Sequence, residues 1–261
     1  MIAVDAEGMP GICAKSECDR EHADYPPFNA ISTEMVVATA RGAIAGGATE
    51  VWVMDWHSSA RNIDVQSMPN GVHLVRGWTE TPNGMVDTTF DGAAFIGYHS
   101  EANNPGNPLS QTKRFRIDYI KLDGNIVGEF ETDSRMTGCF GVPTILIAGD
   151  EALTSRYTGK FAVVPMTRGI GGAIVMPGSV SEIKDALFDA MKKAVERLVK
   201  PKSKPTKPNF GGKVDVEIKY RKHIDALRAS HYPGAVQIDA NTVKVACDNY
   251  HDAMCAFMFL T

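Results

Sequence analysis

The chain has 261 residues and a formal net charge of −4, with 44% hydrophobic and 22% charged residues. This composition is ordinary for a globular protein with a sizeable core. The charge excludes a strongly basic surface of the kind that neutralises phosphates, so we expect no nucleic-acid partner. Since no apolar run is long enough to span a bilayer, we also expect no membrane partner.

The number and spacing of the cysteines indicate the redox environment of the protein. The five cysteines are Cys13, Cys18, Cys139, Cys247 and Cys255. No two of them have Cys-x-x-Cys spacing, so the pattern favours neither a disulfide framework nor a zinc knuckle. The first residues, MIAVDAEGMPG, lack the basic and apolar regions of a secretory signal. We therefore expect a reduced, cytoplasmic protein.

Short apolar segments alternate with helical patterns along most of the chain, which predicts an α/β fold with a mostly parallel sheet flanked by helices. The first strand is expected at residues 1–4, followed by a long helix at residues 26–48. This helix begins with two prolines and ends at Gly46 and Gly47. Further strands are expected at residues 50–55, 73–77, 92–98, 144–149 and 161–166.

The middle of the chain contains a predicted hairpin at residues 116–130, because Asp123-Gly124 is a two-residue turn signal. Helices are expected at residues 150–157 and 181–200, and the second of these is amphipathic with a basic end.

A proline-rich segment at residues 201–212 predicts a linker or an extended edge segment. The rest of the chain predicts a strand, a helix, two strands and a helix. This part is too short for a core of its own, so we expect it to pack onto the first part or onto another subunit. The expected organisation is a metal-binding α/β domain at residues 1–200 and a small C-terminal α+β subdomain at residues 201–261.

Polar side chains follow several of the predicted strands. Asp5 and Glu7 follow the first strand, His57 and His99 follow two others, and Glu129 lies at the end of the hairpin, just before a helix. Because ligands bind outside the carboxyl ends of strands in open α/β sheets, we expect these five side chains to converge. Each residue alone also has an ordinary interpretation, such as a loop carboxylate, a strand-end histidine or a favourable charge at a helix start.

Three carboxylates and two imidazoles together suit zinc, manganese or cobalt. Five side chains exceed the needs of one tetrahedral zinc, so we expect two ions roughly 3.5–4 Å apart. The charges agree with this hypothesis, because about −3 from the carboxylates meets about +4 from two divalent ions.

Four motifs, VDAEGMPGI, MDWHSS, GYHSEANNPG and VGEFETDS, occur in this order along more than a hundred residues. With them, the chain resembles the zinc-dependent D-aminopeptidase family of bacterial dipeptide-transport operons. The resemblance implies a dinuclear zinc hydrolase that removes N-terminal D-amino acids from short peptides, assembled as a homodecamer of two pentameric rings. It also implies that the metal ligands are Asp5, Glu7, His57, His99 and Glu129, with Asp5 bridging the two ions.

The sequence departs from the family at the catalytic histidine of the loop after the second metal histidine. With one inserted residue this position is Gln111, and without the insertion it is Ser110. Glutamine cannot exchange a proton near neutral pH, although it forms hydrogen bonds. Relatives usually have an arginine in place of Asn29. His22 is the nearest unassigned histidine along the chain, and we expect it to be an exposed loop residue.

The sequence favours a metal-dependent hydrolase that cleaves an amide or related acyl bond in a short peptide or small amino-acid derivative. Glu7 and Glu129 are alternative acceptors for the proton of the attacking water. The absent histidine predicts weak or altered activity on D-amino-acid peptides. The alternative is a metal-bound ring assembly that binds small peptides or amino-acid derivatives with little or no turnover.

Overall fold

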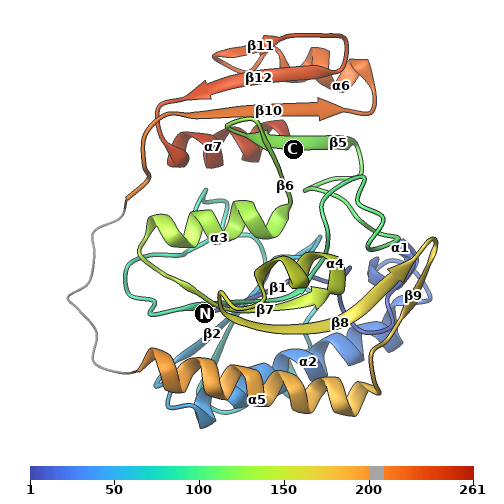
Figure 1. Cartoon of the computed structure of the whole chain (residues 1–261), viewed down its shortest axis with the longest axis vertical. Helices are drawn as coiled ribbons and strands as arrows, with labels where there is room; N and C mark the ends of the chain where they lie inside the picture. Colours follow the sequence, from blue (N-terminus) through green and yellow to red (C-terminus); the bar gives the residue numbers. More distant parts are fainter. Residues whose placement is uncertain (200–208) are drawn as a thin grey trace.

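A seven-stranded sheet forms the centre of the computed structural model, which describes residues 1–199 and 209–261 (Figure 1). Its strand order is β3-β2-β1-β4-β7-β8-β9, and all neighbours are parallel except β8 and β9. The strands are β1 (Ile2–Val4), β2 (Val51–Asp55), β3 (Val72–Val75), β4 (Ala93–Tyr98), β7 (Thr144–Asp150), β8 (Ala162–Ile170) and β9 (Ala173–Val175). The predicted mostly parallel sheet is confirmed, and the short edge strand β9 is an addition to it.

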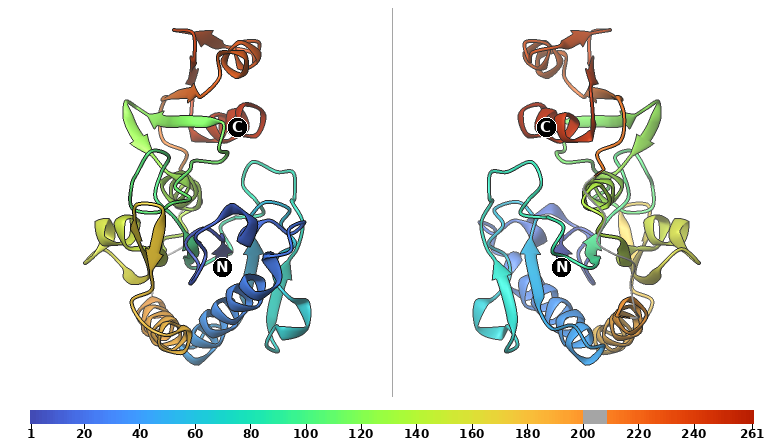
Figure 2. Two further views of the ribbon diagram at one scale, coloured as in Figure 1. Left: turned by 90° about the vertical axis from the view of Figure 1, so that its right-hand side faces the viewer. Right: turned by 90° about the vertical axis from the view of Figure 1, so that its left-hand side faces the viewer.

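Helices cover both faces of this sheet. On one face, α2 (Tyr25–Ala45) packs against α5 (Val180–Leu198), and on the other lies α3 (Glu129–Cys139) (Figures 1 and 2). Prolines occupy the first turn of α2, where their missing N–H groups cost nothing. A capping box between Ser179 and Glu182 begins α5. The shorter helices are α1 (Lys15–Cys18), η1 (Val65–Ser67), α4 (Glu151–Thr154) and η2 (Ser155–Tyr157).

A second, antiparallel sheet has the order β11-β12-β10-β5-β6. Its members are β5 (Ile117–Leu122), β6 (Asn125–Val127), β10 (Val214–Tyr220), β11 (Ala235–Gln237) and β12 (Thr242–Cys247), accompanied by α6 (His223–Ala229) and α7 (Tyr250–Leu260). The predicted hairpin is confirmed, because Asp123 and Gly124 turn with φ of 51° and 82°. The order of elements predicted after residue 213 is confirmed as well.

The second sheet joins parts of the chain that are distant in sequence. Strand β10 pairs with β5 of the hairpin, with Ile218 opposite Ile120. The segment predicted as a linker at residues 201–212 lies largely outside the described residues, as does Lys200 at the end of the predicted helix. The division into residues 1–200 and 201–261 stays a prediction.

Two apolar clusters lie on the two faces of the large sheet. One is enclosed by β1, α2 and α5 and contains Ile2, Met35 and Leu187. The other continues from Phe95 and Phe130 through α7 into the second sheet. All five cysteines are free. Within the described ranges, no helix combines the length and apolar character needed to cross a bilayer.

The carboxyl ends of β1 and β4 touch through their backbones. The N–H of Gly8 donates to the carbonyl of Gly97 at 2.8 Å. A Cβ on Gly97 would lie 2.0 Å from the carbonyl oxygen of Asp5, and one on Gly8 would lie 2.0 Å from that of Tyr98. Gly97 also has a φ of 78°, which L side chains rarely adopt. Glycine at both positions therefore allows the two strand ends to meet.

Asp150 connects the end of β7 to the segment after β4. Its buried carboxylate accepts hydrogen bonds from the backbone N–H and hydroxyl of Ser100, and from the N–H of Leu153 at the start of α4. We expect Asp150→Ala to lower the free energy of unfolding by about 3–5 kcal/mol, because buried donors lose a charged acceptor. Urea unfolding measures this change.

Asp64 provides a matched control, because it caps η1 from an exposed position. Asp64→Ala should lower the free energy of unfolding much less than Asp150→Ala, since water replaces the lost acceptor. Equal losses in the two variants would contradict the structural role assigned to Asp150.

Candidate metal centre

The structure places the five side chains predicted from strand ends around one point. Asp5 and Glu7 follow β1, His57 follows β2, His99 follows β4, and Glu129 is the first residue of α3. Strand β1 lies between β2 and β4, so the connections on its two sides lead away in opposite directions. Such a switch point is where open α/β sheets bind their ligands.

His99 lies at the centre of this cluster. Its Nε2 atom is 3.3 Å from Asp5 Oδ2, 3.4 Å from Glu129 Oε1 and 4.0 Å from Glu7 Oε2. On the other side, His57 Nε2 is 3.6 Å from Glu7 Oε1. The five side chains therefore form one continuous cluster, with Glu7 in contact with both histidines.

Hydrogen bonds around the cluster orient the two histidines. His99 Nδ1 donates to the carbonyl oxygen of Ser100 at 2.9 Å, because a carbonyl only accepts. This places a proton on Nδ1 and leaves Nε2 facing the carboxylates of Asp5 and Glu129, as the atom that a metal would bind once Nε2 is deprotonated. The loop carrying His57 is held by Asp55, which accepts from the N–H of His57 at 3.3 Å and from the amide of Asn62 at 3.0 Å.

Burial and mutual contact shift the pKa values of these groups. Burial, reinforced by the charge of Glu7, raises the pKa of Asp5 from 3.8 to about 7. Burial opposes ionisation of Glu7 as well, but His57 and His99 lower its pKa below the ordinary value. Burial likewise disfavours the charged histidines, yet the adjacent carboxylates raise the pKa of both well above 6.5.

The donor atoms fit a divalent metal. Asp5 Oδ2, Glu7 Oε2, His57 Nδ1 and His99 Nε2 are buried and have no hydrogen-bond partner in the described part of the chain. Such atoms are costly unless another group binds them. Ligand atoms of Asp5, Glu7 and His99 lie within 4.8 Å of one another, as do those of Glu7, Cys18 and His57. Carboxylate, imidazole and thiol groups are the ligands of zinc sites.

Gln111 lies beside Glu7 at the edge of the cluster. Its buried Nε2 donates to Glu7 Oε1 at 2.5 Å. From the same loop, the amide of Asn107 donates to the backbone carbonyl of Glu7 at 2.9 Å. Both residues therefore fix the orientation of Glu7.

Two other residues that the sequence singled out lie elsewhere. His22 is exposed, as expected, and its Nδ1 is 3.4 Å from Asp24 Oδ2. The amide of Asn29 donates to the hydroxyl of Tyr25 at 2.9 Å and to the backbone carbonyl of Asn62. Neither side chain lines the cavity in front of the five clustered residues.

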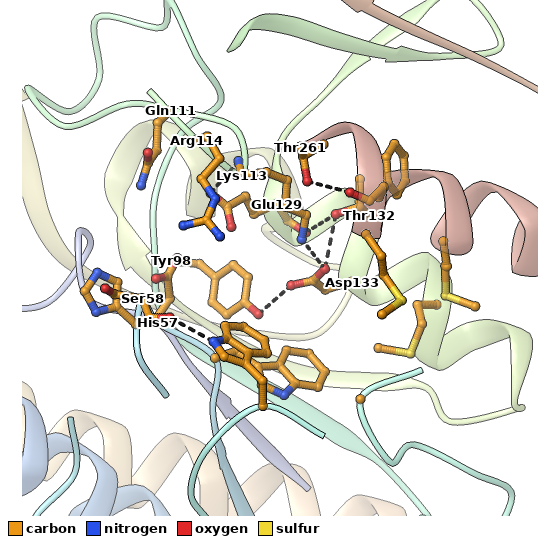
Figure 3. A pocket seen from close by; sticks show the side chains of 18 of the residues that line it. His57, Ser58, Tyr98, Gln111, Lys113, Arg114, Glu129, Thr132, Asp133 and Thr261 are labelled. Carbon is orange, nitrogen blue, oxygen red and sulfur yellow. Dashed lines mark hydrogen bonds and ion pairs between the residues drawn. The ribbon is translucent and has the colours of Figure 1, made fainter. Parts of the chain in front are cut away.

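A cavity of about 590 Å³ opens on the cluster and includes Asp5, Glu7, His57 and Glu129 in its wall. Part of the wall is apolar and is formed by Trp56, Trp78, Met136, Met254, Phe257 and Met258. The opposite part is polar, as Figure 3 shows. There, Asp133 accepts from the hydroxyl of Tyr98 at 2.9 Å and from the ammonium of Lys113 at 2.8 Å.

Sequence reasoning missed four residues of this site: Cys18, Tyr98, Lys113 and Asp133. A signal existed for two of them, because Tyr98 precedes His99 directly and Asp133 lies one helical turn after Glu129. No sequence pattern indicated Cys18 or Lys113. Their positions depend on how the connections around them fold: Cys18 ends the short helix α1, and Lys113 lies in a loop.

Comparison with known proteins agrees with this geometry. The family model of peptidase M55, described as D-aminopeptidase, matches residues 1–259. The chain belongs to this family. Among its relatives, the D-aminopeptidase of Bacillus subtilis (strain 168) is 32% identical over 153 residues, which make up 58% of this chain and 55% of that protein. The chain thus matches about half the length of this curated relative.

A solved structure covers more of the molecule. The Zn-dependent D-aminopeptidase DppA from Bacillus subtilis, described as a self-compartmentalizing protease, has a TM-score of 0.88 to this M55 chain at 25% identity. The superposition covers 100% of this chain and 96% of that one. The family resemblance and the fold predicted from the sequence are both confirmed.

The pKa shifts predict how pH affects the metal-free protein. Between about pH 4 and 7 the folded chain binds more protons than the unfolded chain, because the pKa of Asp5 is raised to about 7. Because the pKa values of His57 and His99 are raised, the folded chain also binds more protons than the unfolded chain above pH 6.5. We expect the chelator-treated protein to be less stable at pH 8 than at pH 5 by a few kcal/mol in urea unfolding.

The lowered pKa values of Glu7 and Glu129 act below pH 4.5 and do not affect this comparison. Asp5→Asn should reduce the pH dependence, since it removes the titrating group. Zinc should restore stability at pH 8, because it binds only the folded state. Equal stability of the metal-free protein at both pH values would contradict the expected charge balance.

Proposed function

We propose that this M55 protein is a dinuclear zinc aminopeptidase acting on short peptides or small amino-acid derivatives. The observation that carries the proposal is the buried group of Asp5, Glu7, His57, His99 and Glu129 in the wall of a cavity of about 590 Å³. This volume is typical of small-molecule sites. In this proposal Asp5 bridges the two ions, and manganese or cobalt can replace zinc.

When bound, two zinc ions would polarise the scissile carbonyl and lower the pKa of the attacking water. The chain then has to hold its carboxylates in place and accept a proton. Gln111 fixes Glu7 through a hydrogen bond of 2.5 Å. Glu129 accepts from the N–H of Lys113 at 2.8 Å and is more exposed to the cavity than Glu7. We therefore assign to Glu129 the role of accepting, on a carboxylate oxygen, the proton that the attacking water releases.

The two sides of the cavity suggest how a peptide is oriented. Trp56, Trp78 and Met136 offer an apolar wall for the side chain of the substrate. Arg114 also lines the cavity, and its guanidinium has no ion-pair partner among the described residues. A short peptide has a free carboxylate, which an arginine binds in bidentate geometry. Arg114 therefore suits the carboxyl end of a short peptide.

The metal is tested directly. We expect about two zinc ions per chain by elemental analysis after zinc loading, and fewer in Asp5→Ala, because the bridging carboxylate is lost. The same preparations are screened for hydrolysis of D- and L-amino-acid dipeptides with zinc, manganese and cobalt. Chelator-treated protein is the control, and absence of bound metal after loading would refute the proposal.

Gln111 allows a gain-of-function test. General acid–base groups contribute about 10²–10⁴-fold to rates, and glutamine supplies no proton. We expect slow wild-type hydrolysis of a D-alanyl dipeptide and a rate increase of up to this order in Gln111→His, at unchanged metal content. Initial rates at saturating zinc measure the difference.

Ser110 provides the matched control, because it is adjacent in sequence but does not line the cavity. Ser110→His should leave the rate unchanged. Fast wild-type turnover, or equal rates in wild type and Gln111→His, would show that the missing histidine is not what limits this protein.

The position of Gln111 also favours a second candidate function, a metal-bound ring assembly that binds small peptides without turnover. The hydrolysis screen separates the two, since binding without product formation at any metal supports the second. In either case we propose a homodecamer of two pentameric rings. Its support is the structural likeness to a self-compartmentalizing protease, and light scattering at micromolar concentration measures the assembled mass.

A further inference from the structure

Cys18 places a thiol next to the candidate metal centre, beside two of the five predicted ligands. It is the last residue of α1, in the connection between β1 and α2, and only 4% of it is exposed. Its sulfur lies within 4.8 Å of ligand atoms of both Glu7 and His57. Its own hydrogen bond is to the carbonyl of Lys15 at 3.3 Å, which is a weak interaction within the same turn.

The neighbours of this thiol are buried and incompletely bonded. Glu7 and His57 are 2% and 8% exposed. Glu7 Oε2 and His57 Nδ1 both lack hydrogen-bond partners in the described ranges of the chain. Three groups that each bind zinc therefore meet in a space where the protein leaves polar atoms unsatisfied.

With Asp5 as a bridge, the five predicted ligands supply three to each of the two ions. His99 and Glu129 are 3.4 Å apart and lie with Asp5 on one side of the cluster. On the other side, Glu7 and His57 are the members that meet Cys18. Asp5, Glu7 and His57 together supply three ligands to the second ion, and tetrahedral zinc needs four.

We propose that Cys18 is the fourth, sulfur ligand of the ion held by Glu7 and His57. This inference rests on the dinuclear centre proposed above. It makes the two ions unlike each other, because one has a closed set of four protein ligands including a thiolate. Closed sites with sulfur are typical of structural zinc, and sites with an open position are typical of catalysis. The ion beside His99 and Glu129 is then the one that meets the substrate.

Metal preference follows from the thiolate. Soft sulfur ligands favour zinc and cadmium, whereas manganese prefers oxygen ligands. Manganese should therefore replace zinc readily beside His99 but poorly beside Cys18. The protein would retain one zinc ion in the presence of excess manganese.

Cobalt(II) tests the sulfur ligand by spectroscopy, independently of catalysis. A cobalt–thiolate bond gives a charge-transfer band in the near ultraviolet, which nitrogen and oxygen ligands do not produce. We expect this band in wild-type protein loaded with cobalt, its loss in Cys18→Ser, and its retention in Cys13→Ser. Cys13 is the matched control, since it lies in the same connection but outside the group of ligand atoms.

Metal counts complete the experiment. Elemental analysis after dialysis should show two zinc ions in wild type and about one in Cys18→Ser, because loss of a direct ligand weakens binding by more than about tenfold. Two bound cobalt ions without the band in wild type would overturn the role of Cys18 and leave the dinuclear centre intact. A band that persists in folded Cys18→Ser would overturn it as well. Wild-type protein that binds no metal would overturn both proposals.

Discussion

Three carboxylates and two imidazoles share one buried space at the carboxyl edge of the sheet, and this concentration of charge constrains the segments around it. Burial opposes ionisation of every member, and the carboxylates repel one another. Each group therefore needs a fixed neighbour. The hydrogen bond between Asp55 and Asn62 stabilises the conformation of the loop after β2. From the loop after β4, Asn107 and Gln111 donate hydrogen bonds to Glu7.

Strand ends made much of this arrangement predictable from the sequence. Parallel strands deliver the residues that follow them to one edge, so the positions of Asp5, His57 and His99 depended only on recognising three apolar segments. Glu129 was recognisable because a turn signal at Asp123-Gly124 fixed the hairpin before it. The local sequence is enough to predict the position of a site residue where that residue directly follows a helix or a strand.

The remaining features depend on contacts that no local pattern encodes. Cys18 reaches Glu7 and His57 through a connection without a regular period. Lys113 meets Asp133 in the cavity wall because an irregular loop lies against helix α3. The pairing of β10 with β5 joins residues that are about a hundred positions apart, and it is decided by tertiary packing. Such features become visible only in three dimensions.

The contact between Gly8 and Gly97 has a consequence for how such a protein diversifies. Any side chain at either position would collide with the opposite backbone, so the separation of Asp5 and His99 is set by main-chain atoms. The apolar wall of the cavity comes from other segments, namely α3, α7 and the two residues Trp56 and Trp78. Substitutions in this wall would leave the Gly8–Gly97 contact unchanged, so the lining of the cavity can vary while Asp5 and His99 keep their separation.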